Sequence, residues 1–340
     1  MTTFADGLFQ YGGMPVSSGT VPFTGKTFWV EPVNGSDGNN GLSPGRAFAT
    51  LYAAHSAATA GNNDVVYLIG DGASTGTARL SLANAQVWDS AASAGTLVWS
   101  KNATHLIGVG SPTRVGQRAR IAPPSGTYTA ATFGSAAFIT VSGSGCYFSN
   151  FSVFNGFSTG GTNQIAATVS GSRNTFSNVN VQGMGDDASA QSAGSRSVKI
   201  SGGENTFINC VIGNDTVTRT QANASVEFAS ATARNTFQNC VFPFQTSAAG
   251  VLGVLGTGAF CMDRWQLFEQ CTFVNNVKST STAMTVLGSL TNAAPGGMLL
   301  YRYCTLVGIG EYGDTIALAN TYIDGGTVTA ATTGIAVAPT

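Results

Sequence analysis

Short segments of alternating apolar and polar residues recur along the middle of this 340-residue chain. Each segment has an aromatic residue and, three positions later, a small or apolar residue, and in all but the last an amide stands two positions after the aromatic residue; Gly, Ser and Asn bound the segments. The aromatic positions, 28 to 33 residues apart, are Phe148, Phe176, Phe207, Phe237, Phe268 and Tyr301. Such alternation favours strands over helices. Because repeats of this period bury their apolar faces by stacking, the pattern predicts an all-β solenoid, a parallel β-helix.

The repeat predicts columns of identical side chains along the solenoid. Aromatic rings on successive coils would stack at the strand spacing of about 4.8 Å. The amide column suits a sharp bend between two strands, since Asn tolerates the left-handed conformation and amides can bond along the stack. This column contains Asn150, Asn178, Asn209, Asn239 and Gln270.

Four of the six cysteines share the next column, on four successive coils: Cys210, Cys240, Cys271 and Cys304. Neighbouring parallel strands lie within disulfide range, so a bridge is one interpretation and metal binding is another. No CxxC or Cys/His pair has zinc-site spacing. We therefore predict that the column is a buried, reduced core filler.

The residues before three of the segments are Arg173, Glu204 and Arg234. A carboxylate between two guanidiniums could belong to a catalytic site. At a repeated edge position, an exposed ion ladder worth about 0–1 kcal/mol per pair is the preferred interpretation.

Residues 28–54 contain a strand, the run Gly-Ser-Asp-Gly-Asn-Asn-Gly-Leu-Ser-Pro and then Ala-Phe-Ala-Thr-Leu before a short helix. This order resembles the opening of pectate-lyase-like right-handed β-helix proteins, and the resemblance covers roughly residues 28–325. It implies a right-handed solenoid with a helix at about residues 48–60 capping its N-terminal end. It specifies the fold and not the function. At about 30 residues per coil, the length allows roughly nine coils.

Four segments follow from these signals. Residues 1–26 form an extended arm, 27–63 a strand, turn and capping helix, 64–325 the β-helix, and 326–340 a C-terminal tail. Gly and Pro punctuate the arm, so we expect it to be mobile alone and to anchor on a partner. Its anchoring residues are Phe4, Leu8, Phe9, Tyr11 and Phe23. Residues 245–262 and 276–298 are interpreted as apolar inserts able to contact a neighbouring subunit.

Charged residues make up only 9% of the chain, and the formal net charge is −1. Such a chain has no basic patch for nucleic acid or an anionic membrane. No stretch approaches the length of a membrane span. The N-terminus lacks the regions of a signal peptide, which predicts synthesis and assembly in a cytoplasm.

The 16 acidic residues are scattered, with local groupings only at positions such as Asp186/Asp187 and Glu227. A lyase would need a calcium-binding carboxylate cluster, and a glycosidase a pair of carboxylates. Asp37 and Asn39 could begin a calcium loop, but a Gly/Asn turn is the preferred interpretation. We therefore expect that the protein is not an enzyme and that it binds neither a metal nor a cofactor.

A low-charge β-helix with an apolar arm predicts a bacteriophage virion structural protein. The first hypothesis is a head-decoration or accessory shell protein, located in the virion and anchored by its arm. The alternative is a tail fibre or tailspike module that binds or cleaves host surface polysaccharide. The expected partners are the major capsid protein or neck and tail proteins, together with further copies in a homo-oligomer such as a trimer.

Overall fold

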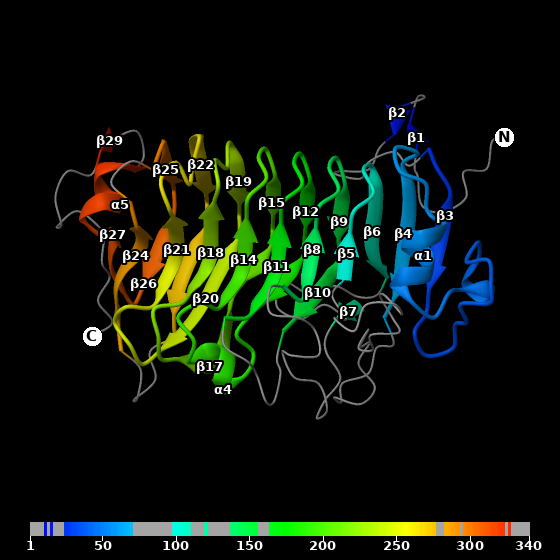
Figure 1. Ribbon diagram of the computed structural model, residues 1–340, viewed down its shortest axis with the longest axis horizontal. Coiled ribbons are helices and arrows are strands. Elements are labelled where there is room, and N and C mark those ends of the chain that lie inside the picture. The colour runs from blue at the N-terminus through cyan, green and yellow to red at the C-terminus, as the bar shows by residue number, and fades with distance from the viewer. Residues whose placement is uncertain are drawn as a thin grey trace.

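The computed structural model describes residues 10–11, 14–15, 24–70, 97–109, 119–121, 137–155, 163–276, 282–292, 295–323 and 326–327. Three sheets wind into a right-handed parallel β-solenoid with very little helix. Figure 1 shows the coils stacked from β3 and β4 at one end to β27 and β29 at the other. From β8 to β23, five successive coils each give at least one strand to all three sheets, and the sheets continue toward both ends. The predicted count of nine coils stays a prediction.

The sheets are named here by the order in which a coil visits them. Sheet 1 contains β5 (Leu97–Trp99), β8 (Ile139–Val141), β11 (Ile165–Val169), β14 (Arg196–Ile200), β18 (Ala224–Ala229), β21 (Leu252–Thr257), β24 (Met284–Leu290) and β27 (Ile309–Gly313). Sheet 2 contains β3 (Thr27–Val30), β4 (Asp64–Ile69), β6 (Thr104–Val109), β9 (Tyr147–Ser149), β12 (Thr175–Ser177), β15 (Thr206–Ile208), β19 (Asn235–Gln238), β22 (Arg264–Glu269), β25 (Gly297–Arg302), β28 (Thr321–Ile323) and β29 (Gly326–Thr327). Sheet 3 contains β7 (Ala119–Ile121), β10 (Phe151–Phe154), β13 (Asn180–Gln182), β16 (Val211–Ile212), β17 (Asn214–Arg219), β20 (Val241–Thr246), β23 (Thr272–Asn275) and β26 (Thr305–Val307). Pairing within these three sheets is parallel, except that β29 runs antiparallel to β28.

The aromatic side chains of sheet 2 stack inside the solenoid. Consecutive ring centroids from Phe148 to Phe268 lie 4.6 to 4.8 Å apart with interplanar angles of 5 to 12°. Tyr301 continues the stack at 5.1 Å. This spacing equals that of neighbouring strands, so in-register pairing by itself sets the rings in contact.

Single residues in the left-handed conformation make the bend from sheet 2 to sheet 3. Asn150, Asn178, Asn209 and Asn239 have φ between 52 and 59°, and Gln270 has φ of 52°. Side-chain amides also form hydrogen bonds along this column: Asn178 Nδ2 donates to Asn150 Oδ1 at 3.0 Å, and Asn239 Nδ2 donates to Asn209 Oδ1 at 2.6 Å.

A second amide column, which the sequence reasoning missed, lies buried at the start of the sheet 2 strands. The side-chain oxygen of Asn205 accepts from the backbone N–H of Asn174 one coil earlier, at 3.0 Å. Asn235 accepts from Asn205 N–H in the same way at 2.9 Å. These bonds satisfy backbone groups that the turn leaves unpaired.

Short helices interrupt the strands: η1 (Pro44–Arg46), α1 (Leu51–Ala57), α4 (Asp187–Ala190) and α5 (Thr315–Ala319). In α1, Leu51 and Ala54 are buried in the core, and Thr50 caps the N-terminus. The Asp37 carboxylate accepts from the backbone N–H groups of Ala49 and Thr50 and from the Thr50 hydroxyl. The oxygens of Asp37 therefore tie the preceding turn to the start of α1.

The structure describes little of the predicted arm, within which β1 (Gln10–Tyr11) and β2 (Met14–Pro15) pair antiparallel. Phe4, Leu8, Phe9 and Phe23 lie outside the described residues, and of Tyr11 only the backbone is described. The two predicted inserts contain β21 and β24, which pair with each other in sheet 1. Their residues Val254 and Leu287 are fully buried, so they fill the core instead of facing a neighbouring subunit.

Candidate functional site

The outer face of sheet 1 carries a row of side chains, one per coil, that runs parallel to the solenoid axis. The neighbours of these residues along the strands, such as Val141, Val169 and Ile200, point into the core, so the row itself faces outward. The pairing register aligns its members, which we call the sheet 1 track: Val98, Thr140, Thr168, Lys199, Glu227, Leu255 and Ser289.

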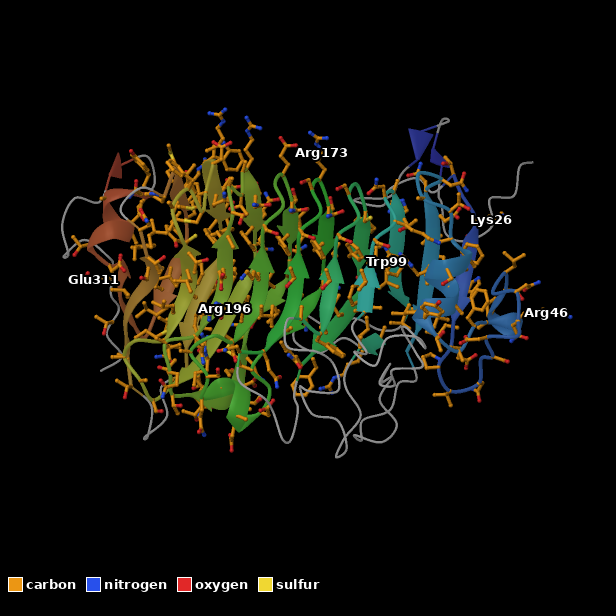
Figure 2. All side chains as sticks on the ribbon, viewed as in Figure 1. Lys26, Arg46, Trp99, Arg173, Arg196 and Glu311 are labelled. Carbon is orange, nitrogen blue, oxygen red and sulfur yellow. The ribbon has the colours of Figure 1, made fainter. Side chains whose placement is uncertain are left out.

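The charged centre of the track is a compact cluster around Glu227. Arg196 Nε donates to Glu227 Oε2 at 2.6 Å. Lys199 Nζ lies 3.1 Å from Oε1, and the Thr257 hydroxyl donates to Oε1 at 2.9 Å. Arg196 Nη1 also donates to two carbonyl oxygens, those of Ala193 and Ser195, both at 2.7 Å. The guanidinium is thereby fixed by three hydrogen bonds, and Figure 2 shows Arg196 on the middle coils.

Burial and charge act in opposite directions on Glu227, which is only 5% exposed. Burial by itself would raise the pKa of its carboxyl, but Arg196 and Lys199 outweigh burial and lower the pKa. The carboxylate is therefore ionised, and both of its oxygens have hydrogen-bond or ion-pair partners. The cluster holds two cations for one anion. Because the Lys199 side chain is 35% exposed and its ammonium has three donors, Lys199 presents the excess positive charge to solvent.

The predicted ion ladder lies away from this cluster, at the bend where coils leave sheet 1 for sheet 2. Glu204 accepts from Arg173 Nε at 2.7 Å and from Arg234 Nη1 at 2.9 Å. Hydrogen bonds from Arg173 and Arg234 lower the pKa of Glu204. All three side chains are substantially exposed, so screening by solvent makes this ladder a weak structural feature.

The adjacent aspartates are not a catalytic pair. Asp186 caps α4, since its Oδ1 accepts from Ser189 N–H at 2.9 Å and its Oδ2 from the Ser189 hydroxyl at 3.0 Å. Asp187 is exposed in the first turn of that helix. Both positions serve the helix start, where negative charge is favourable.

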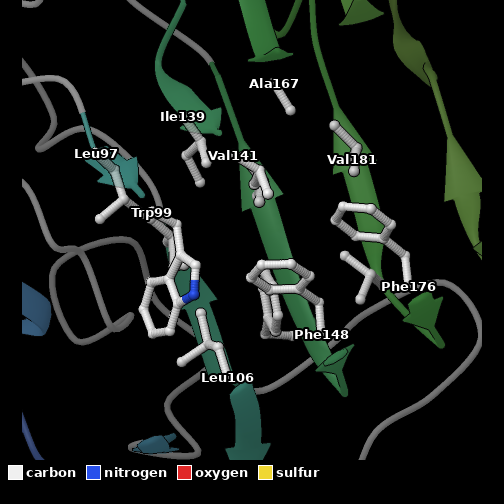
Figure 3. A pocket seen from close by; sticks show the side chains of 13 residues that line it. Leu97, Trp99, Leu106, Ile139, Val141, Phe148, Ala167, Phe176 and Val181 are labelled. Atoms are coloured by element: carbon white, nitrogen blue, oxygen red, sulfur yellow. The ribbon is translucent and has the colours of Figure 1, made fainter. Parts of the chain in front are cut away.

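An apolar cavity of about 30 Å³ lies inside the solenoid near β5 and β8. Figure 3 shows Trp99, Leu106, Val141, Phe148 and Phe176 around it. The one ring nitrogen there, Trp99 Nε1, donates to the Thr104 carbonyl at 3.3 Å. The cavity lining thus offers no group that could bind or activate a polar substrate.

Within the described ranges, no group of three His, Cys, Asp or Glu side chains is placed to hold a metal ion. No helix in the described part of the chain is both long and apolar enough to cross a membrane.

Neither a protein-family model nor a curated protein matches the chain. Solved structures do. The pectin methylesterase from Erwinia chrysanthemi is 16% identical with a TM-score of 0.52, over 86% of this chain and 81% of that one. The pectin methylesterase from Aspergillus niger is 14% identical with a TM-score of 0.50, over 90% and 83%. A rhamnogalacturonan lyase is 14% identical with a TM-score of 0.51, over 89% and 75%. At such identities, the likeness establishes the parallel β-helix fold.

These neighbours contradict the prediction that the protein is not an enzyme, since all three process polysaccharides. The signature expected of an active site was a pair or cluster of carboxylates, so Arg196, Lys199 and Thr257 were not predicted as site residues, and Glu227 was noted only among the scattered acidic residues. A usable signal existed, because Lys199 and Glu227 are 28 residues apart, which is one coil.

Proposed function

We propose that the protein is a polysaccharide-active β-helix protein and that its sheet 1 track binds an acidic polysaccharide. The carrying observation is Lys199, a partly exposed ammonium held over a buried carboxylate at the centre of an otherwise uncharged row. The polysaccharide-processing enzymes that share the fold support the choice of ligand class.

The spacing of the track suits a linear polymer that lies along the solenoid axis. Thr140 and Thr168 are half-exposed and occupy the two coils before Lys199. Successive coils place these side chains about 4.8 Å apart. The two hydroxyls would form hydrogen bonds with sugar hydroxyls, while the Lys199 ammonium would donate to a carboxylate of the polysaccharide. That hydrogen bond is charge-assisted and therefore stronger.

Arg196 and Glu227 hold the lysine in place. The Glu227 carboxylate forms an ion pair with the Lys199 ammonium through Oε1 and with the Arg196 guanidinium through Oε2. Removing either partner from a buried pair leaves an uncompensated charge, which costs about 3–5 kcal/mol. We therefore assign Arg196 and Glu227 as positioning residues and Lys199 as the residue that contacts the ligand.

We also propose, from the sequence, that the protein belongs to a bacteriophage virion. In a bacteriophage virion, the bound polymer would be a surface polysaccharide of the host, and residues 1–26 would join the protein to its neighbours. Helix α1 would cap a solenoid of about nine coils. Attachment to the head and attachment to the tail both fit this proposal.

Binding to polygalacturonate, with neutral dextran as the reference polymer, tests the proposed function. We expect wild type to bind polygalacturonate only, less tightly as salt rises. Lys199→Ala should weaken binding about 10- to 100-fold, the value of one hydrogen bond to a charged group. Arg46→Ala is the matched control, because Arg46 is an exposed cation at the N-terminal end of the rod (Figure 2). Equal loss in both variants would reduce the effect to net charge and refute the track.

Product analysis tests the processing part of the proposal. The masses of released sugars distinguish hydrolysis, elimination and loss of an ester group. We expect product from at least one acidic polysaccharide and no product with Lys199→Ala. Release that persists in this variant would place the activity elsewhere on the chain.

A further inference from the structure

The four cysteines of the repeat column form a ladder of thiols with one repeated geometry. Each Sγ lies 3.3 to 3.4 Å from the carbonyl oxygen of a phenylalanine one coil earlier: Phe176, Phe207, Phe237 and Phe268 in turn. Each thiol therefore leans toward the preceding coil, which for Cys240, Cys271 and Cys304 carries the preceding cysteine. All six cysteines lie in the described part of the chain, and none forms a disulfide.

The ladder is closed at one end and accessible at the other. Cys210, Cys240 and Cys271 are at most 1% exposed, and burial raises the pKa of the Cys240 thiol. Cys304 is only partly buried, contrary to the sequence-based expectation. The cause is its place in the fold: Cys304 precedes β26, the last strand of sheet 3 among the described residues.

Cys271 and Cys304 are in position to react with each other. The residues after them, Thr272 and Thr305, are paired in the parallel register of β23 and β26. Neighbouring strands lie about 4.8 Å apart, inside the Cα range of a disulfide.

We propose that Cys304 is an oxidation site and that Cys271 reacts with the oxidised Cys304 to form a disulfide. This disulfide would link the starts of β23 and β26, the last two strands of sheet 3 among the described residues. A peroxide oxidises the Cys304 thiol to a sulfenic acid and is itself reduced to water. The Cys271 sulfur then attacks Cys304 Sγ, the S–O bond breaks, and the leaving hydroxide takes the Cys271 proton as a second water. Two thiols and one peroxide thus give one disulfide and two waters.

The bond would close a loop that contains all of β24 and β25. A solenoid is held only by neighbouring coils, so its terminal coil is the first to separate. A covalent link across β23 and β26 restrains the unfolded chain and opposes that separation. The ladder therefore allows oxidation to stabilise the C-terminal end without changing the fold.

The test treats the folded, full-length protein with hydrogen peroxide and maps thiols and disulfides by mass spectrometry after digestion. We expect a Cys271–Cys304 link and a higher Tm than in the reduced protein. Cys304→Ser should show neither, whereas Cys210→Ser, at the buried end of the ladder, should show both. Because either variant could fold poorly, thiol labelling of the untreated wild type gives a second readout, and Cys304 should label first among the four.

Three results would overturn the proposal. The first is a link confined to Cys210 and Cys240, and the second is sulfinic or sulfonic acid at Cys304 without any link. The third is a Cys271–Cys304 link that leaves the Tm unchanged.

Discussion

Replacing Phe237 by alanine should be among the most destabilising single changes in the solenoid. The ring is fully buried and stacks on Phe207 and Phe268, both at 4.7 Å with interplanar angles of 6 and 7°. It also meets the rings of Phe228 at 6.3 Å and Phe242 at 6.0 Å. The substitution removes contacts on every side of the ring.

The magnitude follows from burial, cavity and ring contacts. Phe→Ala changes in cores cost about 3–5 kcal/mol, including the cavity left behind. Aromatic pairs contribute about 0.5–1.5 kcal/mol each beyond their area, so four ring neighbours place Phe237→Ala near 5 kcal/mol. Phe176 borders the apolar cavity and stacks on two rings, Phe148 and Phe207. Phe176→Ala should therefore cost less, about 3 kcal/mol.

Urea unfolding followed by circular dichroism measures both losses, with the change in midpoint converted to free energy at constant slope. Thr236→Ala is the matched control, because Thr236 lies half-exposed on the same strand and should change stability by at most about 0.5 kcal/mol. The reasoning is refuted if Phe237→Ala costs less than about 1 kcal/mol, or no more than Phe176→Ala.

Two further predictions concern pH and the arm. Burial lowers the pKa of His55 and His105 to about 4, and each accepts backbone hydrogen bonds through a ring nitrogen. Because the unfolded chain binds these protons below about pH 6.5, the free energy of unfolding should fall between pH 6.5 and 4, by up to about 3 kcal/mol per histidine. Urea midpoints across this range check it, and a His55→Gln variant with an unchanged pH slope would contradict the assignment. Because residues 1–26 are proposed to anchor the protein on its virion partners, deleting residues 2–24 should abolish incorporation into virus particles. The same deletion should leave the Tm and the circular dichroism spectrum unchanged. Unfolding of the truncated protein would assign the arm to the solenoid itself.

The repeat alone was enough to predict two of the three sheets. In these coils the aromatic residue lies on a strand of sheet 2, the amide two positions later makes the left-handed bend, and the small or apolar residue after it leads into a strand of sheet 3. So short a bend keeps the spacing of the motif constant, and a constant spacing is readable in a sequence.

Sheet 1 escaped notice because its strands stand between turns of varying length. β21 and β24, for example, lie in the two segments that the sequence predicted as inserts. The inward residues of sheet 1, such as Val198 and Val254, are buried by the stacking of coils and not by any local pattern.

The candidate site depended on tertiary structure for the same reason. Arg196, Glu227 and Thr257 come from three coils, and parallel pairing alone brings them within hydrogen-bonding distance. The sequence determined that the coils stack, because their columns of Phe, Asn and Cys repeat. Only the register of sheet 1 decided which charges meet, since a shift by one residue would turn Lys199 and Glu227 into the core.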